Sequence, residues 1–331
     1  MTHKYWTIIY YAAALVSLAA CSPADPPQTT PPALQVGTAT SEAAGLAALI
    51  ATWEAENSAP TNAAAPATLR PSAAPNATAT RLASPDDWQS APVVPQSISG
   101  RAAEIYLHGL ELGSNPQAFS KVGDCGGTPS WFLGSFDLDA QYYSLGEYEY
   151  LAAMFTHYAG SFERYSLAVS PGFNTASVFA PLWADPELCS SDEGPLACEL
   201  RINRPSVVLI MLGTNDQYHP AEFEEPMRKI IEYTIAQGAL PILSSKADNL
   251  EGDHSINRTL YKLSLEYELP FWNFWLAVQY LPNQGMQEDG AHLTWAPNYF
   301  DRPDALNTGW AMRNLTALQA LYAVWQALPQ P

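Results

Sequence analysis

Three short polar segments contain the residue types that nucleophilic catalysis requires. Residues 123–127, Gly-Asp-Cys-Gly-Gly, carry the thiol of Cys125, and the small residues around it permit a sharp turn. Residues 213–216, Gly-Thr-Asn-Asp, carry the amide of Asn215, which can donate to a developing negative charge. Asp289 precedes His292 by three residues, so its carboxylate can hold one ring nitrogen while the other acts as a base. Together these residues predict a site with catalytic potential.

The three segments resemble, in the same order, the consensus blocks of the SGNH/GDSL hydrolase family. Residues 123–125 look like the Gly-Asp-Ser block, with Cys125 in place of the family's serine. Residues 213–216 match the Gly-x-Asn-Asp block, and residues 289–292 match the Asp-x-x-His block. Gly172 is our choice for the glycine of the remaining block. The resemblance extends from about residue 119 to the C-terminus.

The resemblance implies a role for each of these residues. Cys125 would attack the carbonyl, and His292, oriented by Asp289, would take its proton and later return it to the leaving group. The backbone N–H groups of Cys125 and Gly172 and the side chain of Asn215 would form the oxyanion hole. Neither a metal nor an organic cofactor is expected.

Other roles are open for the same residues. Cys125 could be a buried apolar thiol or the disulfide partner of Cys189 or Cys198. The Asp–His pair could be structural, and the Asn-Asp segment could close a turn. A thiol beside histidine ionises more easily than a hydroxyl, but sulfur is larger and is oxidised more readily. Trp295, close to the histidine, is expected to contact substrate.

Alternating strand-like and helix-like segments would position the polar segments. Apolar runs predict strands, and 3.6-residue periodicity predicts helices. The strands are predicted at residues 118–122, 165–169, 206–212, 240–243 and 271–274, and the helices at 147–158, 223–234 and 310–325. This alternation predicts one α/β domain over residues 100–331, with a doubly wound, mostly parallel sheet and helices on both faces. Sites in such sheets form beyond the carboxyl ends of the strands.

The N-terminal third is expected to lie outside this domain. Residues 1–21 have the pattern of a signal peptide, and their Leu-Ala-Ala-Cys ending resembles a bacterial lipobox with Cys21 as the lipidated residue. A short membrane anchor or an ordinary signal peptide is the alternative. Residues 22–99, rich in Ala, Pro and Thr, predict a disordered tether, in which residues 42–54 could be helical. The expected location is the cell envelope, outside the cytoplasm and anchored to a membrane.

Charge and cysteine content narrow the function further. The formal net charge is −18 and the chain has no Lys/Arg cluster, so nucleic acid is excluded as a partner. Cys189 and Cys198 flank a turn-rich stretch and could form a disulfide outside the cytoplasm. The sequence therefore predicts an extracytoplasmic acyl-ester hydrolase acting on a glycan or lipid ester. The alternatives are a catalytically silent glycan- or envelope-binding lipoprotein and a thiol-dependent thioesterase or acyltransferase.

Overall fold

A parallel sheet forms the centre of the fold in the computed structural model, which describes residues 39–57 and 83–329. The strands of this sheet run in the order β1-β3-β4-β5, and every pair is parallel. They are β1 (Asn115–Gly123), β3 (Pro205–Met211), β4 (Leu240–Ser244) and β5 (Phe271–Trp272). A separate parallel ladder pairs β2 (Tyr143–Ser144) with β6 (Asn298–Tyr299).

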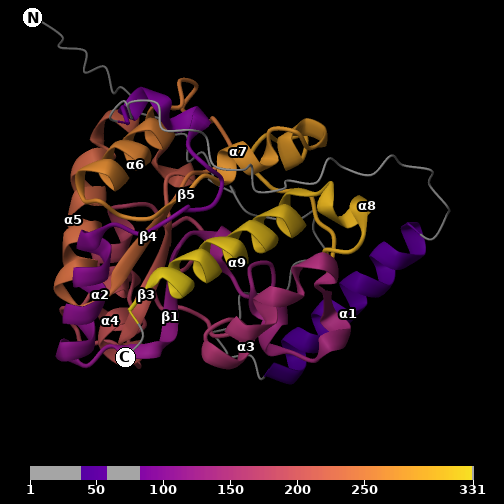
Figure 1. Cartoon of the computed structure of the whole chain (residues 1–331), viewed down its shortest axis with the longest axis horizontal. Helices are drawn as coiled ribbons and strands as arrows, with labels where there is room; N and C mark the ends of the chain where they lie inside the picture. Colours follow the sequence, from indigo (N-terminus) through magenta and orange to yellow (C-terminus); the bar gives the residue numbers. More distant parts are fainter. Residues whose placement is uncertain (1–38, 58–82, 330–331) are drawn as a thin grey trace, which may run out of the picture.

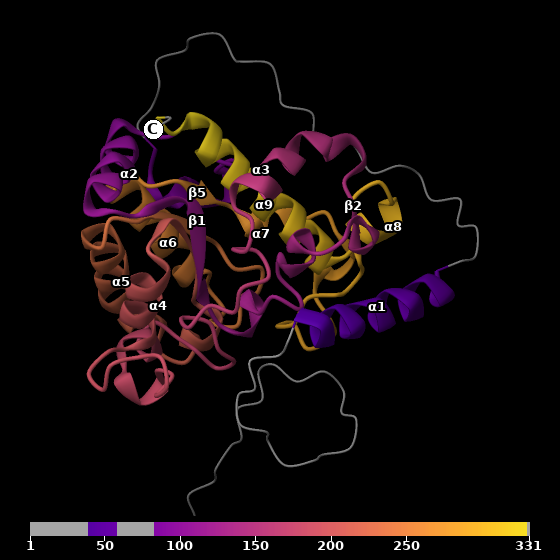
Figure 2. The ribbon, with the colours of Figure 1, turned by 90° about the horizontal axis from the view of Figure 1, so that it is seen from below.

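Helices cover both sides of the central sheet, as Figures 1 and 2 show. α2 (Gly100–Leu112), α5 (Glu224–Ala236) and α6 (Ser255–Glu266) lie on one side, and α9 (Gly309–Ala327) crosses the other. The remaining helices are α1 (Ala39–Glu56), α3 (Ala153–His157), α4 (Pro195–Asn203), α7 (Phe274–Val278) and α8 (Pro303–Leu306). The architecture is therefore the three-layer α/β fold that the sequence predicted.

Burial explains the positions of the main elements. All seven residues of β3 are buried, as a strand between two neighbours and two helical layers requires. In α5 the buried residues are those that the helical period predicted, Met227, Ile230, Ile231 and Thr234. The hydrophobic core is thus continuous from the sheet into the helices on either side.

One predicted strand is wrong. Residues 165–169 contribute only a single parallel bridge, between Val169 and Gly123 at the end of β1. Hydrogen bonds within the segment close a turn, because the Val169 N–H donates to the Ser166 carbonyl at 3.1 Å. The Ser166 hydroxyl donates instead to the Lys121 carbonyl of β1 at 2.6 Å. The strands predicted at 118–122, 206–212 and 240–243 are confirmed, and the one at 271–274 is shorter.

The described part of the expected tether is ordered, which corrects the prediction for residues 39–57 and 83–99. The helix suggested near residues 42–54 is α1. Trp88 is buried and packs against Trp275, with 4.7 Å between ring centroids. The buried Asn273 amide donates to the carbonyls of Trp88 and Ala91 at 2.8 and 2.9 Å. Average composition concealed these anchors, because one tryptophan can bury a large area in an otherwise polar segment.

The predicted signal peptide and the lipidated Cys21 lie outside the described residues. Within the described part of the chain, no helix has the length and hydropathy needed to cross a membrane.

The predicted disulfide between Cys189 and Cys198 is confirmed, and it closes the loop that leads into α4. The two residues are nine apart, so the bond restricts a short loop of the unfolded chain. Replacing both cysteines with alanine should lower the free energy of unfolding by about 2–3 kcal/mol on the chain-entropy estimate. Urea titration followed by tryptophan fluorescence measures this loss. An unchanged urea midpoint would show that the bond contributes nothing.

Candidate active site

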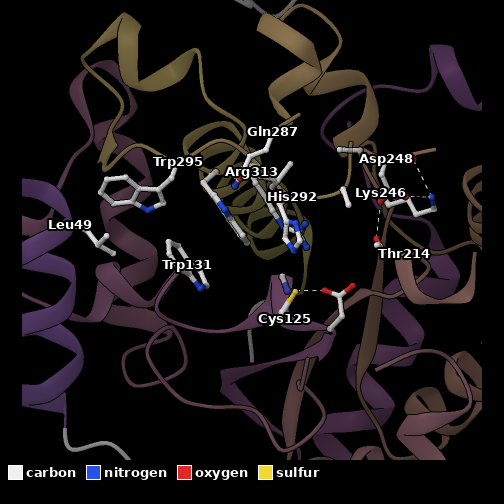
Figure 3. A pocket seen from close by; sticks show the side chains of 16 residues that line it. Leu49, Cys125, Trp131, Thr214, Lys246, Asp248, Gln287, His292, Trp295 and Arg313 are labelled. Atoms are coloured by element: carbon white, nitrogen blue, oxygen red, sulfur yellow. Dashed lines mark hydrogen bonds and ion pairs between the residues drawn. The ribbon is translucent and has the colours of Figure 1, made fainter. Parts of the chain in front are cut away.

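A cavity of about 320 Å³ lies beyond the carboxyl ends of β1, β3 and β4. Figure 3 shows Cys125 on its floor, with His292 and Arg313 above it and the rings of Trp131 and Trp295 to one side. Cys125 and His292, distant in sequence, thus share one cavity. The other lining residues are Leu49, Asp124, Gly126, Thr214, Lys246, Ala247, Asp248, Gln287, Ala291, Leu293 and Trp310.

Cys125 begins a short 3-10 turn, Cys125–Gly127, directly after β1. The Asp124 carboxylate caps this turn by accepting the Gly126 N–H at 2.7 Å. Burial raises the pKa of Asp124, although the positive charge of Arg313 and the Gly126 hydrogen bond oppose the increase. The cap therefore orients the cysteine at the end of the strand.

The Cys125 sulfur is disulfide-bonded in this structure. Its suggested pairing with Cys189 or Cys198 is excluded, because those two bond to each other. Only the reduced form of Cys125 can act as a nucleophile.

His292 lies at the end of a small hairpin that begins near Met286. The Gln287 N–H donates to the His292 carbonyl at 2.7 Å, and Met286 pairs with Leu293 in an antiparallel bridge. Asp289 Oδ2 lies 2.5 Å from His292 Nδ1, and Asp289 Oδ1 accepts the His292 backbone N–H at 3.0 Å. The other ring nitrogen, Nε2, is buried and has no hydrogen-bond partner among the described residues. One nitrogen is held and the other is available, as a general base requires.

The Asp289–His292 contact is expected to persist far into the acid range. Partial burial raises the pKa of Asp289, but hydrogen bonds from the His292 ring and two backbone N–H groups outweigh it and lower the pKa to about 2. Because the pKa of Asp289 is lower in the folded state, the contact contributes its full stabilisation of the fold above the unfolded pKa near 4. This stabilisation is lost as the pH falls through about 2. Carbon-13 NMR of the carboxylate should give a midpoint near 2. A midpoint near 4 would mean that the contact does not form in solution.

The two loops assigned to the oxyanion hole are hydrogen-bonded to each other. The Asn215 amide donates to the Phe173 carbonyl at 2.9 Å. Asp216 accepts the Thr175 hydroxyl at 2.6 Å and the Thr175 N–H at 3.1 Å. Gly172, at φ +82°, begins the loop that Phe173 and Thr175 continue. Asn215 and Gly172 do not themselves line the cavity, whereas their neighbour Thr214 does.

Gly213 has to be glycine for the Asn215 loop to leave β3 as it does. Its φ is +136°, and a Cβ at this position would lie 2.8 Å from the Ile256 side chain. This is a structural reason for the glycine of the Gly-x-Asn-Asp block.

Sequence reasoning missed a cluster of three charged residues after the end of β4. Lys246 Nζ lies 2.5 Å from both Asp248 and Glu251, and Asp248 also accepts the Thr214 hydroxyl at 2.8 Å. These contacts tie the loop after β4 to the Asn215 loop. Lys246 and Asp248 directly follow a predicted strand, so the carboxyl-end rule could have identified them.

Trp295 lines the cavity, as the sequence predicted. The sequence analysis missed two other tryptophans of the cavity wall, Trp131 and Trp310, and the cation Arg313. Trp131 and Trp310 stack with their centroids 6.1 Å apart and their planes at 24°. Arg313 reaches the cavity from α9, in which it is the single charged residue. A lone charge within an apolar helix was the available signal. The described residues include no cluster of three His, Cys, Asp or Glu side chains that could hold a metal.

Known proteins with sequence similarity to this chain are hydrolases. The chain is 31% identical over 100 residues to proteins named thioesterase 1/protease 1/lysophospholipase L1 from Escherichia coli strain K12 and Escherichia coli O6:H1. The match covers 28% of this chain, and the chain spans about half (48%) of the length of these relatives. No family model matches the chain.

Solved structures with a similar outline were also found. A GDSL-like lipase from Bacteroides thetaiotaomicron aligns with a TM-score of 0.41 and 14% identity, over 67% of this chain and 97% of its own. A structure of TesA aligns with a TM-score of 0.35 and 19% identity, over 60% of this chain and 99% of its own.

Proposed function

We propose that this chain, whose motifs resemble those of the SGNH/GDSL hydrolases and whose similar relatives are hydrolases, is an acyl-ester hydrolase acting outside the cytoplasm on an ester-bearing glycan or lipid. The observation that carries this proposal is the hydrogen bonding and burial of the His292 ring. Its Nδ1 is held by Asp289, its Nε2 is buried without a partner among the described residues, and its ring shares a cavity with Cys125. His254 Nδ1 is also buried without a partner among the described residues, but His254 does not line the cavity with Cys125, so the combination of the two features distinguishes His292.

The proposed reaction proceeds through a thioester. His292 Nε2 takes the proton of the Cys125 thiol, and the thiolate attacks the acyl carbon. The tetrahedral intermediate collapses when His292 returns that proton to the departing alcohol. Water, deprotonated by His292, then hydrolyses the thioester and restores the thiol. The backbone N–H groups of Cys125 and Gly172 and the second N–H of the Asn215 amide are proposed to stabilise the oxyanion in both halves.

The dimensions of the cavity favour a small acyl group. A volume of about 320 Å³ is at the lower end of the range for ligand pockets. The rings of Trp131, Trp295 and Trp310 provide flat apolar surfaces on which a sugar face or a short acyl chain can pack. Acetylated glycans and short lipid esters both meet these requirements.

The test is hydrolysis of a short-chain chromogenic ester by the full chain, with and without reductant. Wild type should hydrolyse the ester only after reduction, and Cys125→Ala should be inactive under both conditions. Asn215→Ala should be slower by roughly a hundred- to a thousandfold if its amide stabilises the oxyanion. Reductant-independent turnover in Cys125→Ala would exclude Cys125 as the nucleophile.

Two other functions have specific support. The disulfide at Cys125 favours a silent binding module, because an oxidised sulfur cannot attack a carbonyl. An active Cys125→Ser variant beside an inert, fully reduced wild type would support this reading.

The names of the relatives include thioesterase and lysophospholipase, which favours thioesters or lysophospholipids as substrates. Parallel assays with an acyl thioester and the matching oxygen ester distinguish these from a glycan esterase.

Membrane anchoring through Cys21 is a further part of the proposal, and it rests on the N-terminal pattern alone. Cys21→Ser should move the protein from the membrane fraction to the soluble fraction of the producing bacterium. Retention of this variant in the membrane fraction would contradict a lipid anchor.

A further inference from the structure

We propose that Arg313 binds an anionic group of the substrate, a carboxylate or a phosphate, next to the acyl ester. The inference rests on the proposed function, and it narrows the substrate to an ester that carries a negative charge close to the scissile bond.

Arg313 is held in place by aromatic rings rather than by an acidic partner. Its guanidinium carbon lies 5.2 Å from the ring centroids of both Phe132 and Phe274, and 5.6 Å from that of Trp310. Such contacts fix the position and orientation of the planar group. They do not use its in-plane N–H donors.

The donors of Arg313 are poorly matched by the protein. The Nε atom is buried and has no hydrogen-bond partner among the described residues. The contact of Nη2 is with the sulfur of Met211 at 3.4 Å, a weak acceptor. Arg164, Arg228 and Arg302, by contrast, each pair with a carboxylate.

The charge of Arg313 is therefore only partly balanced. Burial lowers its pKa to about 10, while Asp124 and Asp248 act on it in the opposite direction without forming an ion pair. The group is still a cation at neutral pH. The other cation of the cavity, Lys246, is already paired with Asp248 and Glu251. A bound anion would satisfy the open donors of Arg313 and offset the cost of its burial.

The guanidinium lies beside the reacting atoms. A Cβ placed on Gly126, the residue after Cys125, would be 3.3 Å from Nη2 and 3.4 Å from Nη1. A carboxylate or phosphate on these nitrogens would thus lie near the ester that Cys125 attacks. The overall charge of −18 opposes a polyanion, but screening beyond about 8 Å leaves a single local anion free to bind.

A binding experiment tests this without requiring turnover. Hexanoate, hexyl phosphate and hexan-1-ol are titrated by calorimetry into the full chain and into Arg313→Met and Arg313→Lys. We expect at least one anion to bind the wild type about ten- to a hundredfold more tightly than hexan-1-ol, and the preferred anion identifies the group as carboxylate or phosphate. Arg313→Met should abolish this preference, and Arg313→Lys should retain part of it. Arg228→Met, which changes an arginine stacked on Tyr267, is the matched control and should bind as wild type does.

The outcomes separate this inference from the proposed function. Kinetic assays with 3-acetoxybenzoate and its neutral methyl ester accompany the titrations. Arg313-dependent anion binding without hydrolysis of the acetyl ester in either substrate would support the anion site and count against the proposed hydrolase function. Equal hydrolysis of both esters, with no anion preference in the titrations, would overturn the anion site and leave the hydrolase in place. If Arg313→Met does not fold, the anion-to-alcohol comparison in the wild type and Arg313→Lys still decides the question.

Discussion

Replacing His292 with alanine is expected to lower kcat/KM for a short-chain ester by roughly a thousandfold or more in the reduced protein. The ring is the proposed general base in the attack and the general acid in departure of the alcohol, so both halves of the reaction lose it. Nothing else in the cavity substitutes well, because Lys246 is held by two carboxylates and Arg313 stays protonated near pH 7. The rate comparison is made at pH 8, with thermal unfolding of both proteins as a check on folding.

A matched histidine controls for the general effect of the substitution. His108 Nδ1 lies 3.3 Å from Glu111 at the same three-residue separation, but on the exposed surface of α2. His108→Ala should retain wild-type kcat/KM. Comparable rates for His292→Ala and His108→Ala would contradict the assignment of His292 as the base.

Replacing Arg164 with methionine is expected to lower the free energy of unfolding by about 3–5 kcal/mol, the usual cost of breaking a buried ion pair on one side. Glu199 of α4 is fully buried, and its Oε1 lies 2.5 Å from both Arg164 Nη1 and the Ser120 hydroxyl. Its Oε2 accepts the Leu167 N–H at 2.9 Å. Without Arg164, Glu199 would remain in the core as an uncompensated charge. Urea denaturation at pH 7 measures the loss.

Two further variants show whether the buried charge is the cause. Adding Glu199→Gln to Arg164→Met removes the orphan charge and should restore part of the lost stability. Arg201→Met breaks a comparable pair with Glu193 on the surface and should leave the urea midpoint close to that of wild type. If Arg164→Met alone were as stable as wild type, the pair would contribute only to local geometry. The same pair positions the segment that leads to Gly172, so weaker stabilisation at the proposed oxyanion hole is expected alongside the instability.

Local patterns accounted for much of the fold. The run at residues 206–212 predicted β3 because a strand buried on both faces must be apolar along its whole length. The spacing of Met227, Ile230 and Ile231 predicted α5 because a helix buries one stripe. The apolar pattern gave a wrong prediction at residues 165–169, where a polar side chain replaces a backbone hydrogen bond between strands. Ser166 bonds to β1 through its hydroxyl, and the expected strand became a turn.

The N-terminal segment shows a second limit of pattern reading. Residues 83–99 lack periodicity, yet Trp88 is buried against Trp275 and the Asn273 amide binds two carbonyls of the segment. All of these partners lie more than 150 residues further along the chain. A segment whose order depends on distant partners carries little local signal.

The order of the polar segments, the type of each proposed catalytic residue and the alternation of strands with helices were all readable in the sequence, because each depends on residues that are close together in the chain. The identity of the working base was not. Histidines three residues from a carboxylate occur also at His108, His219 and His254, of which the first two are exposed and the third lies outside the cavity lining. Only the tertiary structure buries the free nitrogen of His292 in a cavity with Cys125 and sets Arg313 there without an acidic partner among the described residues. Burial and unmatched charge arise where distant segments meet, and no local spacing encodes them.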